Sequence, residues 1–132
     1  VQYNTYQILE SQYGPYPFTI NRPHDRVTVE DAPIRFVDPE HPALNTPNQI
    51  SEADFDGWVQ ERGLYFLGDW DERYTPILAS NDPGEDPKLG GMVVAEIGAG
   101  RYVYTGYAFF RQLPAGVPGA YRLFANLISL GN

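Results

Sequence analysis

The stretch from Gly90 to Tyr107 constrains the fold of this chain most, because it has the pattern of two strands joined by a short turn. Apolar, β-branched and aromatic residues fill both arms, and Gly98-Ala99-Gly100 separates them. Glycine adopts the positive φ angles of short hairpin loops without a steric penalty from Cβ. Apolar residues at consecutive as well as alternate positions predict strands covered on both faces, as in a sheet with helices packed on it.

A helix is expected after the hairpin, at the end of the chain. Pro118 suits its first turn and Gly131 its C-terminal stop. Helical spacing then places a set of apolar side chains on one face, which we expect to be buried. The members of this face are Ala120, Phe124, Leu127 and Ile128, with Leu123 and Leu130 widening it.

The rest of the chain is punctuated by proline and glycine, which predicts short strands and turns. Strands are predicted over 1–5, 18–20, 26–30, 34–37, 64–67 and 75–80, with aromatic-rich loop over 6–17, polar loop over 68–74 and an acidic surface loop over 81–87. Pro76 places its strand at a sheet edge or makes it the first residue of the strand. Ser51 followed by Asp54 predicts the start of a short helix, and a helical turn is expected around 43–44.

Length and charge limit the kind of protein. The chain has 132 residues, a net charge of −8, nine dispersed basic residues and no cysteine. These features predict one domain (1–132), or the C-terminal fragment of one, that binds neither nucleic acid nor membrane surfaces. Because Val1–Asn4 resembles the end of a buried strand, we expect the chain to be part of a longer polypeptide, with a tag-cleaved protein as the alternative.

The polar side chains predict no catalytic residue and no cofactor. His24 and His41 have no partner at metal-ligand spacing, so turn roles are expected for both. Asp82, Glu85 and Asp86 are weak candidates for calcium ligands, as is the cluster over 69–72, although neither matches the twelve-residue calcium loop. No serine lies in a nucleophile elbow. Gly98–Gly100 joins two strands, so it does not form a dinucleotide-binding turn.

Aromatic residues are the remaining signal. The chain contains ten Tyr, seven Phe and two Trp, and exposed rings can stack on sugars. Trp58, Trp70, Tyr74 and Tyr107 are therefore candidate ligand-binding residues. The alternative is that these rings pack the core and a domain interface.

Three segments carry a family resemblance. Residues 98–107 (Gly-Ala-Gly-Arg-Tyr-Val-Tyr-Thr-Gly-Tyr) resemble the late glycine-x-glycine, strand, Thr-Gly segment of class I glutamine amidotransferase-like domains, including trehalose-utilisation-type members. Residues 104–122 and 56–65 resemble the C-terminal region of large bacterial PIG-L (LmbE-like) deacetylases, where such a domain follows the catalytic one. The resemblance spans most of the chain. It implies an α/β fold, namely the C-terminal half of a flavodoxin-like, glutamine amidotransferase-like sandwich that is strand-rich with a C-terminal helix.

The resemblance also implies where activity does not lie. Glutaminase activity in the wider class needs a Cys nucleophile and a His-x-Glu pair, and this sequence has neither. The PIG-L catalytic domain binds zinc through a His-Pro-Asp-Asp-type motif, of which His41-Pro42 repeats only the first two residues. Any N-acetylglucosamine-type deacetylase activity of a parent protein is therefore not expected in these residues.

Three functional hypotheses follow. The first is a non-catalytic accessory domain of a larger, periplasmic or secreted carbohydrate-active deacetylase, which serves domain packing, assembly or glycan contact. Its partner would be the upstream part of the same polypeptide, or another chain that completes the sheet. The second is a small glycan hydrolase that uses Asp54, Asp69 or Asp71 as general acid and base. The third is a stand-alone sugar-binding module that uses Trp58 and Trp70.

Overall fold

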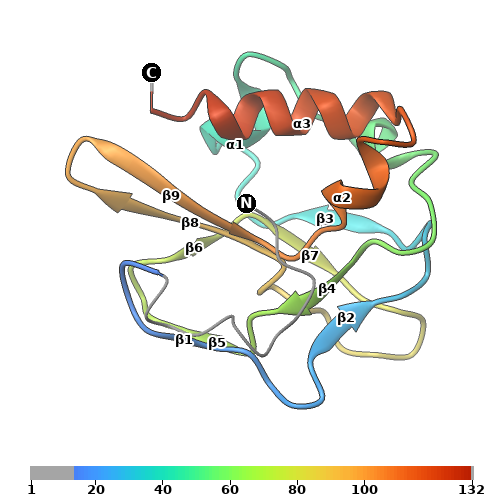
Figure 1. Ribbon diagram of the computed structural model, residues 1–132, viewed down its shortest axis with the longest axis horizontal. Coiled ribbons are helices and arrows are strands. Elements are labelled where there is room, and N and C mark those ends of the chain that lie inside the picture. The colour runs from blue at the N-terminus through green and yellow to red at the C-terminus, as the bar shows by residue number, and fades with distance from the viewer. Residues whose placement is uncertain (1–13, 132) are drawn as a thin grey trace.

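The computed structural model describes residues 14–131 and shows a mixed α/β fold with small antiparallel sheets and a C-terminal helix (Figure 1). The strands are β1 (Phe18–Thr19), β2 (Asp25–Val27), β3 (Ile34–Phe36), β4 (Gly63–Phe66), β5 (Asp69–Trp70), β6 (Thr75–Pro76), β7 (Leu78–Ser80), β8 (Met92–Ile97) and β9 (Gly100–Thr105). The helices are α1 (Pro42–Asn45), the 3₁₀ helix η3 (Glu52–Phe55), α2 (Phe109–Gln112) and α3 (Pro118–Ile128). The strand predicted over 1–5, and the loop over 6–13, lie outside the described residues.

The predicted hairpin is the longest strand pair of the fold. Strands β8 and β9 are antiparallel and in register from Met92↔Thr105 to Ile97↔Gly100. This register leaves Gly98 and Ala99 as a two-residue turn. Gly98 has a φ of +55°, and Ala99 is not in the left-handed region. A positive φ at the first turn residue alone is the pattern of a type II′ turn, which favours glycine there.

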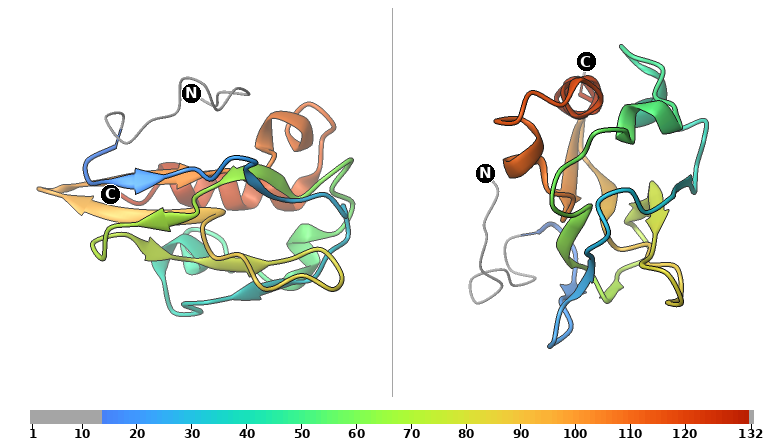
Figure 2. Two further views of the ribbon diagram at one scale, coloured as in Figure 1. Left: turned by 90° about the horizontal axis from the view of Figure 1, so that it is seen from below. Right: turned by 90° about the vertical axis from the view of Figure 1, so that its right-hand side faces the viewer.

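Both faces of β8 are covered, as the sequence predicts. Met92 and Val94 belong to the main core, which also contains Leu123 of α3. Val93 and Ala95 belong to a second core on the opposite face. The second cover is not a helix, because β1 and β5 pair into a two-stranded ribbon there (Figures 1 and 2). Side chains alternate across a strand, so consecutive apolar residues feed the two cores in turn.

Helix α3 begins at Pro118 as predicted and ends at Ile128. The predicted buried face is partly wrong, because Phe124 is 39% exposed and Ile128 is 67% exposed. The helix instead buries Gly119, Ala120, Leu123 and Asn126. Gly119 lies so close to the carbonyl oxygen of Asp54 that a Cβ would come within 1.7 Å of it. Only glycine fits at this distance, so the face of α3 that carries Gly119 points inward.

The shorter elements mostly follow the sequence, with three differences. The strand predicted over 75–80 is divided at Ile77 into β6 and β7, and β6, which contains Pro76, lies at the edge of the β6-β8-β9 sheet. The loop predicted over 68–74 contains β5, which pairs with β1. Strand β2 is shorter than predicted. A 3₁₀ turn begins after Ser51, whose backbone N–H donates to Asp54 Oδ2 at 2.9 Å.

Candidate functional site

Two of the four candidate aromatic residues lie together in the main core. Trp58 is 3% exposed, Tyr107 is fully buried, and their ring centroids are 6.4 Å apart. The indole N–H of Trp58 donates to the Asp54 carbonyl oxygen at 3.1 Å. The Tyr107 hydroxyl lies 2.8 Å from Ser80 Oγ, and burial raises the pKa of Tyr107 above its ordinary value. In this conformation neither ring offers a face to a ligand from solvent.

The other two candidates lie on the opposite side of β8. Tyr74 is buried in the second core, where its hydroxyl donates to the Tyr16 carbonyl oxygen at 2.8 Å and accepts from the Tyr16 N–H at 3.2 Å. Trp70 lies opposite Phe18 on β5 and is half-buried. The structure therefore does not bring the four candidates onto one surface. Trp70 is the one member of the four that is not buried.

The acidic loop is tied to the fold through Asp82. The Asp82 carboxylate accepts from Thr28 N–H at 2.9 Å, Thr28 Oγ1 at 2.7 Å and Val29 N–H at 2.8 Å. Desolvation alone would raise the pKa of Asp82, but these hydrogen bonds favour the ionised form, and the pKa is lowered. The carboxylate thus fixes the start of the 81–87 loop to the end of β2.

The other two calcium candidates lie along an open, polar hollow of about 460 Å³ that Asp25 and residues 84–88 line. Glu85 pairs there with Lys88 at 2.6 Å, and Asp86 is exposed. Within residues 14–131, no three carboxylate or histidine side chains lie close enough to hold a metal ion.

The acids that the hydrolase hypothesis would use are also held by the protein. Asp71 accepts from Arg73 Nε at 2.8 Å, and this hydrogen bond lowers the pKa of Asp71 to about 2. Asp69 accepts from the Trp70 N–H at 3.0 Å. Asp54 pairs with Arg122 of α3 at 2.8 Å, so it faces the helix and not the other two acids.

The two histidines occupy turns, as predicted. His41 Nδ1 accepts from the Ala43 N–H at 3.1 Å and caps α1. His24 packs on Tyr65 with ring centroids 4.3 Å apart. Burial lowers the pKa of both imidazoles. Both histidines therefore have contacts that explain them as parts of the fold.

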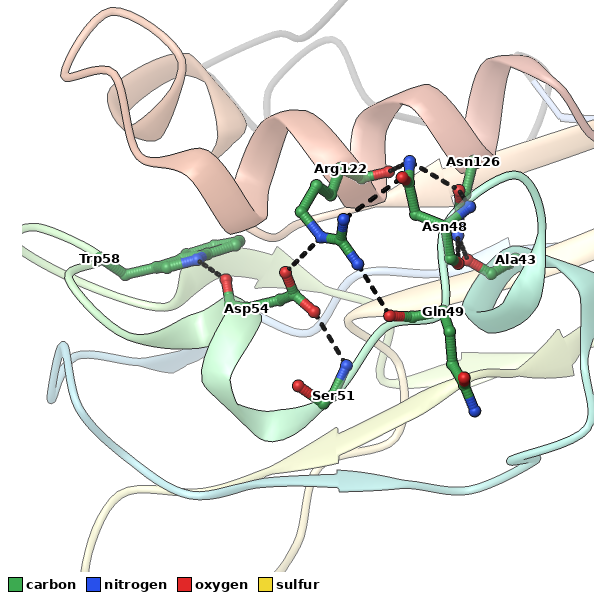
Figure 3. A network of polar contacts seen from close by, with 8 residues as sticks. All are labelled: Ala43, Asn48, Gln49, Ser51, Asp54, Trp58, Arg122 and Asn126. Atoms are coloured by element: carbon green, nitrogen blue, oxygen red, sulfur yellow. Dashed lines mark hydrogen bonds and ion pairs between the residues drawn. The ribbon is translucent and has the colours of Figure 1, made fainter.

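The most connected polar group joins α3 to the segment between α1 and η3 (Figure 3). The fully buried Asn126 amide donates to the carbonyl oxygens of Ala43 at 2.9 Å and Asn48 at 2.7 Å, and it accepts from the Asn48 N–H at 2.8 Å. One turn earlier, Arg122 donates to Asp54 and to the Gln49 carbonyl oxygen at 2.9 Å. Sequence reasoning missed this network, because an Asn among apolar helix residues does not reveal its long-range partners.

Arg62 is a second feature that the sequence did not reveal. Its guanidinium is buried, donates from Nε to the Ala32 carbonyl oxygen at 2.9 Å, and lies 5.8 Å from the Phe55 ring centroid and 6.0 Å from that of Trp58. Desolvation lowers the pKa of Arg62. Backbone carbonyls and aromatic rings stabilise this cation inside the fold.

The polar groups described above stabilise the fold. Helix α3 also carries an exposed apolar stripe. Tyr121 is 50% exposed, and Phe124 and Ile128 join it at helical spacing of three and four residues. We call Tyr121, Phe124, Ala125 and Ile128 the outer face of α3. Ala125 lies between the larger members and is half-buried.

Comparisons with known proteins give no relative: no protein family, curated protein or solved structure matches this chain. Among residues 14–131, the helices are too short or too polar for any of them to cross a bilayer.

Proposed function

We propose that this chain is a non-catalytic accessory domain that serves packing and assembly in a larger carbohydrate-active protein of the PIG-L deacetylase type. The deacetylase context comes from the resemblance of residues 56–65 and 104–122. The observation that carries the assembly role is the outer face of α3, which presents Tyr121, Phe124 and Ile128 to solvent. Contiguous exposed apolar side chains mark interaction surfaces on soluble proteins.

The charged side chains support a structural role. Arg122 holds α3 on Asp54, Arg111 pairs with Glu61 at 2.8 Å, and Asp82 ties its loop to β2. General acid–base catalysis needs a group that can exchange protons near neutral pH. Asp71, with its pKa near 2, stays ionised there.

The proposal includes a flavodoxin-like architecture for the domain to which this chain belongs. A flavodoxin-like sheet is mostly parallel, whereas the strand pairs among residues 14–131 are antiparallel. A place for this chain in such a sandwich would require strands from another part of the polypeptide or from another chain. The periplasm or the exterior of the cell is the compartment that the carbohydrate context favours.

Glycan contact is a second candidate function, and the partial exposure of Trp70 favours it. Titration of chito-oligosaccharides, followed by tryptophan fluorescence, tests it. Glycan contact through Trp70 predicts a saturable change that Trp70→Phe removes. A flat response across a panel of glycans would contradict it.

The accessory role is tested by incubating the purified chain with N-acetylated oligosaccharides and measuring release of acetate and of reducing ends. We expect neither product to exceed the no-protein control. Turnover that Asp69→Asn or Asp71→Asn abolishes would replace this proposal with the hydrolase hypothesis. Glu72→Gln is the matched control for charge loss, because Glu72 is exposed in the same turn.

A further inference from the structure

The first turn of α1 depends on one titratable side chain, His41. Its Nδ1 atom accepts from the Ala43 N–H at 3.1 Å, as the side chain of an N-cap residue does. Pro42, at the first helical position, has no N–H, so Ala43 carries the first N–H of the helix. The first turn of α1 contains no acidic residue that could replace the imidazole. The side-chain cap of α1 is therefore the Nδ1 atom of His41.

The capped residue also connects α1 to α3. Ala43 is fully buried, so water has little access to its N–H, and a buried N–H that loses its acceptor costs more than one that turns to solvent. The carbonyl oxygen of Ala43 accepts from the Asn126 side chain of α3 at 2.9 Å (Figure 3). The N–H and the C=O of Ala43 thus link His41 to α3.

The hydrogen bond at Nδ1 requires a neutral imidazole. A neutral ring that carries its proton on Nε2 leaves Nδ1 free to accept, whereas an imidazolium carries N–H groups on both nitrogens and accepts at neither. Protonation of His41 therefore points an N–H at the Ala43 N–H and removes the cap. Histidine is the side chain whose charge ordinarily changes nearest neutral pH.

Charged groups on the neighbouring elements act on His41 in opposite directions. Asp38, in the turn before α1, favours the imidazolium, whereas Arg101 of β9 disfavours it. On α3 the one charged residue is Arg122, which pairs with Asp54 at 2.8 Å. Burial has the largest effect, and with Arg101 it lowers the pKa of His41 below its ordinary value. The folded chain therefore keeps this imidazole neutral to a lower pH than the unfolded chain does.

We propose that His41 is a pH-sensitive cap, whose protonation releases the first turn of α1 and weakens the hold of α1 on α3. This inference goes beyond the accessory role, because it concerns how the chain responds to acid and not what the chain assembles with. Because the pKa of His41 is lowered in the folded state, the stabilisation by the cap is full above the ordinary imidazole pKa and is lost as pH falls through the folded value.

Hydrogen exchange followed by NMR tests the proposal at a single amide. The Thr46 N–H donates to the Pro42 carbonyl oxygen at 3.0 Å and closes the turn of α1. We expect the protection factor of this amide, which corrects for the intrinsic pH dependence of exchange, to fall about fivefold between about pH 8 and about pH 5. The fall should follow the titration of the His41 imidazole signals, with a midpoint below the ordinary pKa of histidine.

Two substitutions separate the cap from other effects of acid. Asparagine caps helices through a side-chain oxygen that does not titrate, so His41→Asn should keep Thr46 protected over the whole range. His24→Gln removes the other of the two histidines and should leave the acid response unchanged. Protection of Thr46 that stays constant in the unchanged chain, or that falls equally in His41→Asn, would overturn the proposal. An acid response that His24→Gln removes would overturn it as well.

Discussion

The Asn126 amide is predicted to be the main polar anchor of α3, and Asn126→Ala tests this. The substitution removes the partner of three backbone groups, namely the carbonyl oxygens of Ala43 and Asn48 and the Asn48 N–H. A buried polar group left without a partner costs about 1–3 kcal/mol. The Ala43 contact is buried and the Asn48 contacts are partly exposed, so water replaces part of what Asn48 loses.

A cost of about 2 kcal/mol at Ala43 and about 1 kcal/mol at each Asn48 group gives a total near 4 kcal/mol. The better helix propensity of alanine returns about 0.5 kcal/mol. The expected loss in the free energy of unfolding is therefore about 3–4 kcal/mol, a large share of the 5–15 kcal/mol typical of a protein domain.

Urea unfolding followed by tryptophan fluorescence measures this loss, because Trp58 donates to Asp54 directly beneath α3. The control is Asn45→Ala. The Asn45 amide donates to two carbonyl oxygens at 2.8 and 2.9 Å on the exposed surface, so we expect it to cost under about 1 kcal/mol. A loss below about 1 kcal/mol for Asn126→Ala, or equal losses for the two variants, would refute the anchoring role of Asn126.

Three further predictions concern other contacts. Asp82→Asn should lower the free energy of unfolding by about 1–3 kcal/mol at neutral pH. Because the pKa of Asp82 is lowered in the folded state, the stabilisation by its carboxylate is full above the ordinary carboxyl pKa and is lost as pH falls through the folded value. The control Asp86→Asn, at an exposed position, should change neither the free energy of unfolding nor its dependence on pH. Gly119→Ala should destabilise the protein by about 1–3 kcal/mol in thermal unfolding, since its Cβ would overlap the Asp54 carbonyl oxygen, whereas Gly131→Ala meets nothing within 4 Å and should be neutral. Acrylamide should quench Trp70 and spare Trp58, which Trp58→Phe and Trp70→Phe distinguish; equal quenching of both would contradict the placement of Trp58 in the core.

The local parts of the fold could be predicted from the sequence, and the long-range parts could not. The β8–β9 hairpin was predictable because glycine in the turn and apolar arms act within a few residues. Strand β5 was not, because Asp69–Trp70 becomes a strand only by pairing with β1, some 50 residues earlier. The positive φ of Tyr65, +56°, is likewise set by an irregularity in the β2–β4 pairing.

The orientation of α3 shows the same limit. Periodicity selects a buried face when a helix is polar on one side, and α3 has apolar residues on both sides. The inner face is decided by Gly119 and Asn126, whose partners are Asp54 and Asn48 far away in sequence. The aromatic content left both ligand binding and core packing open, and the structure places Trp58, Tyr74 and Tyr107 in the cores.

An assembly role for the outer face of α3 can be measured by light scattering on the product of the full reading frame, unchanged and with Ile128→Glu. We expect a mass of two or more copies for the unchanged protein, a fall toward one copy for Ile128→Glu, and no fall for Ile97→Glu. The same mass for all three proteins would contradict an assembly role for the outer face of α3.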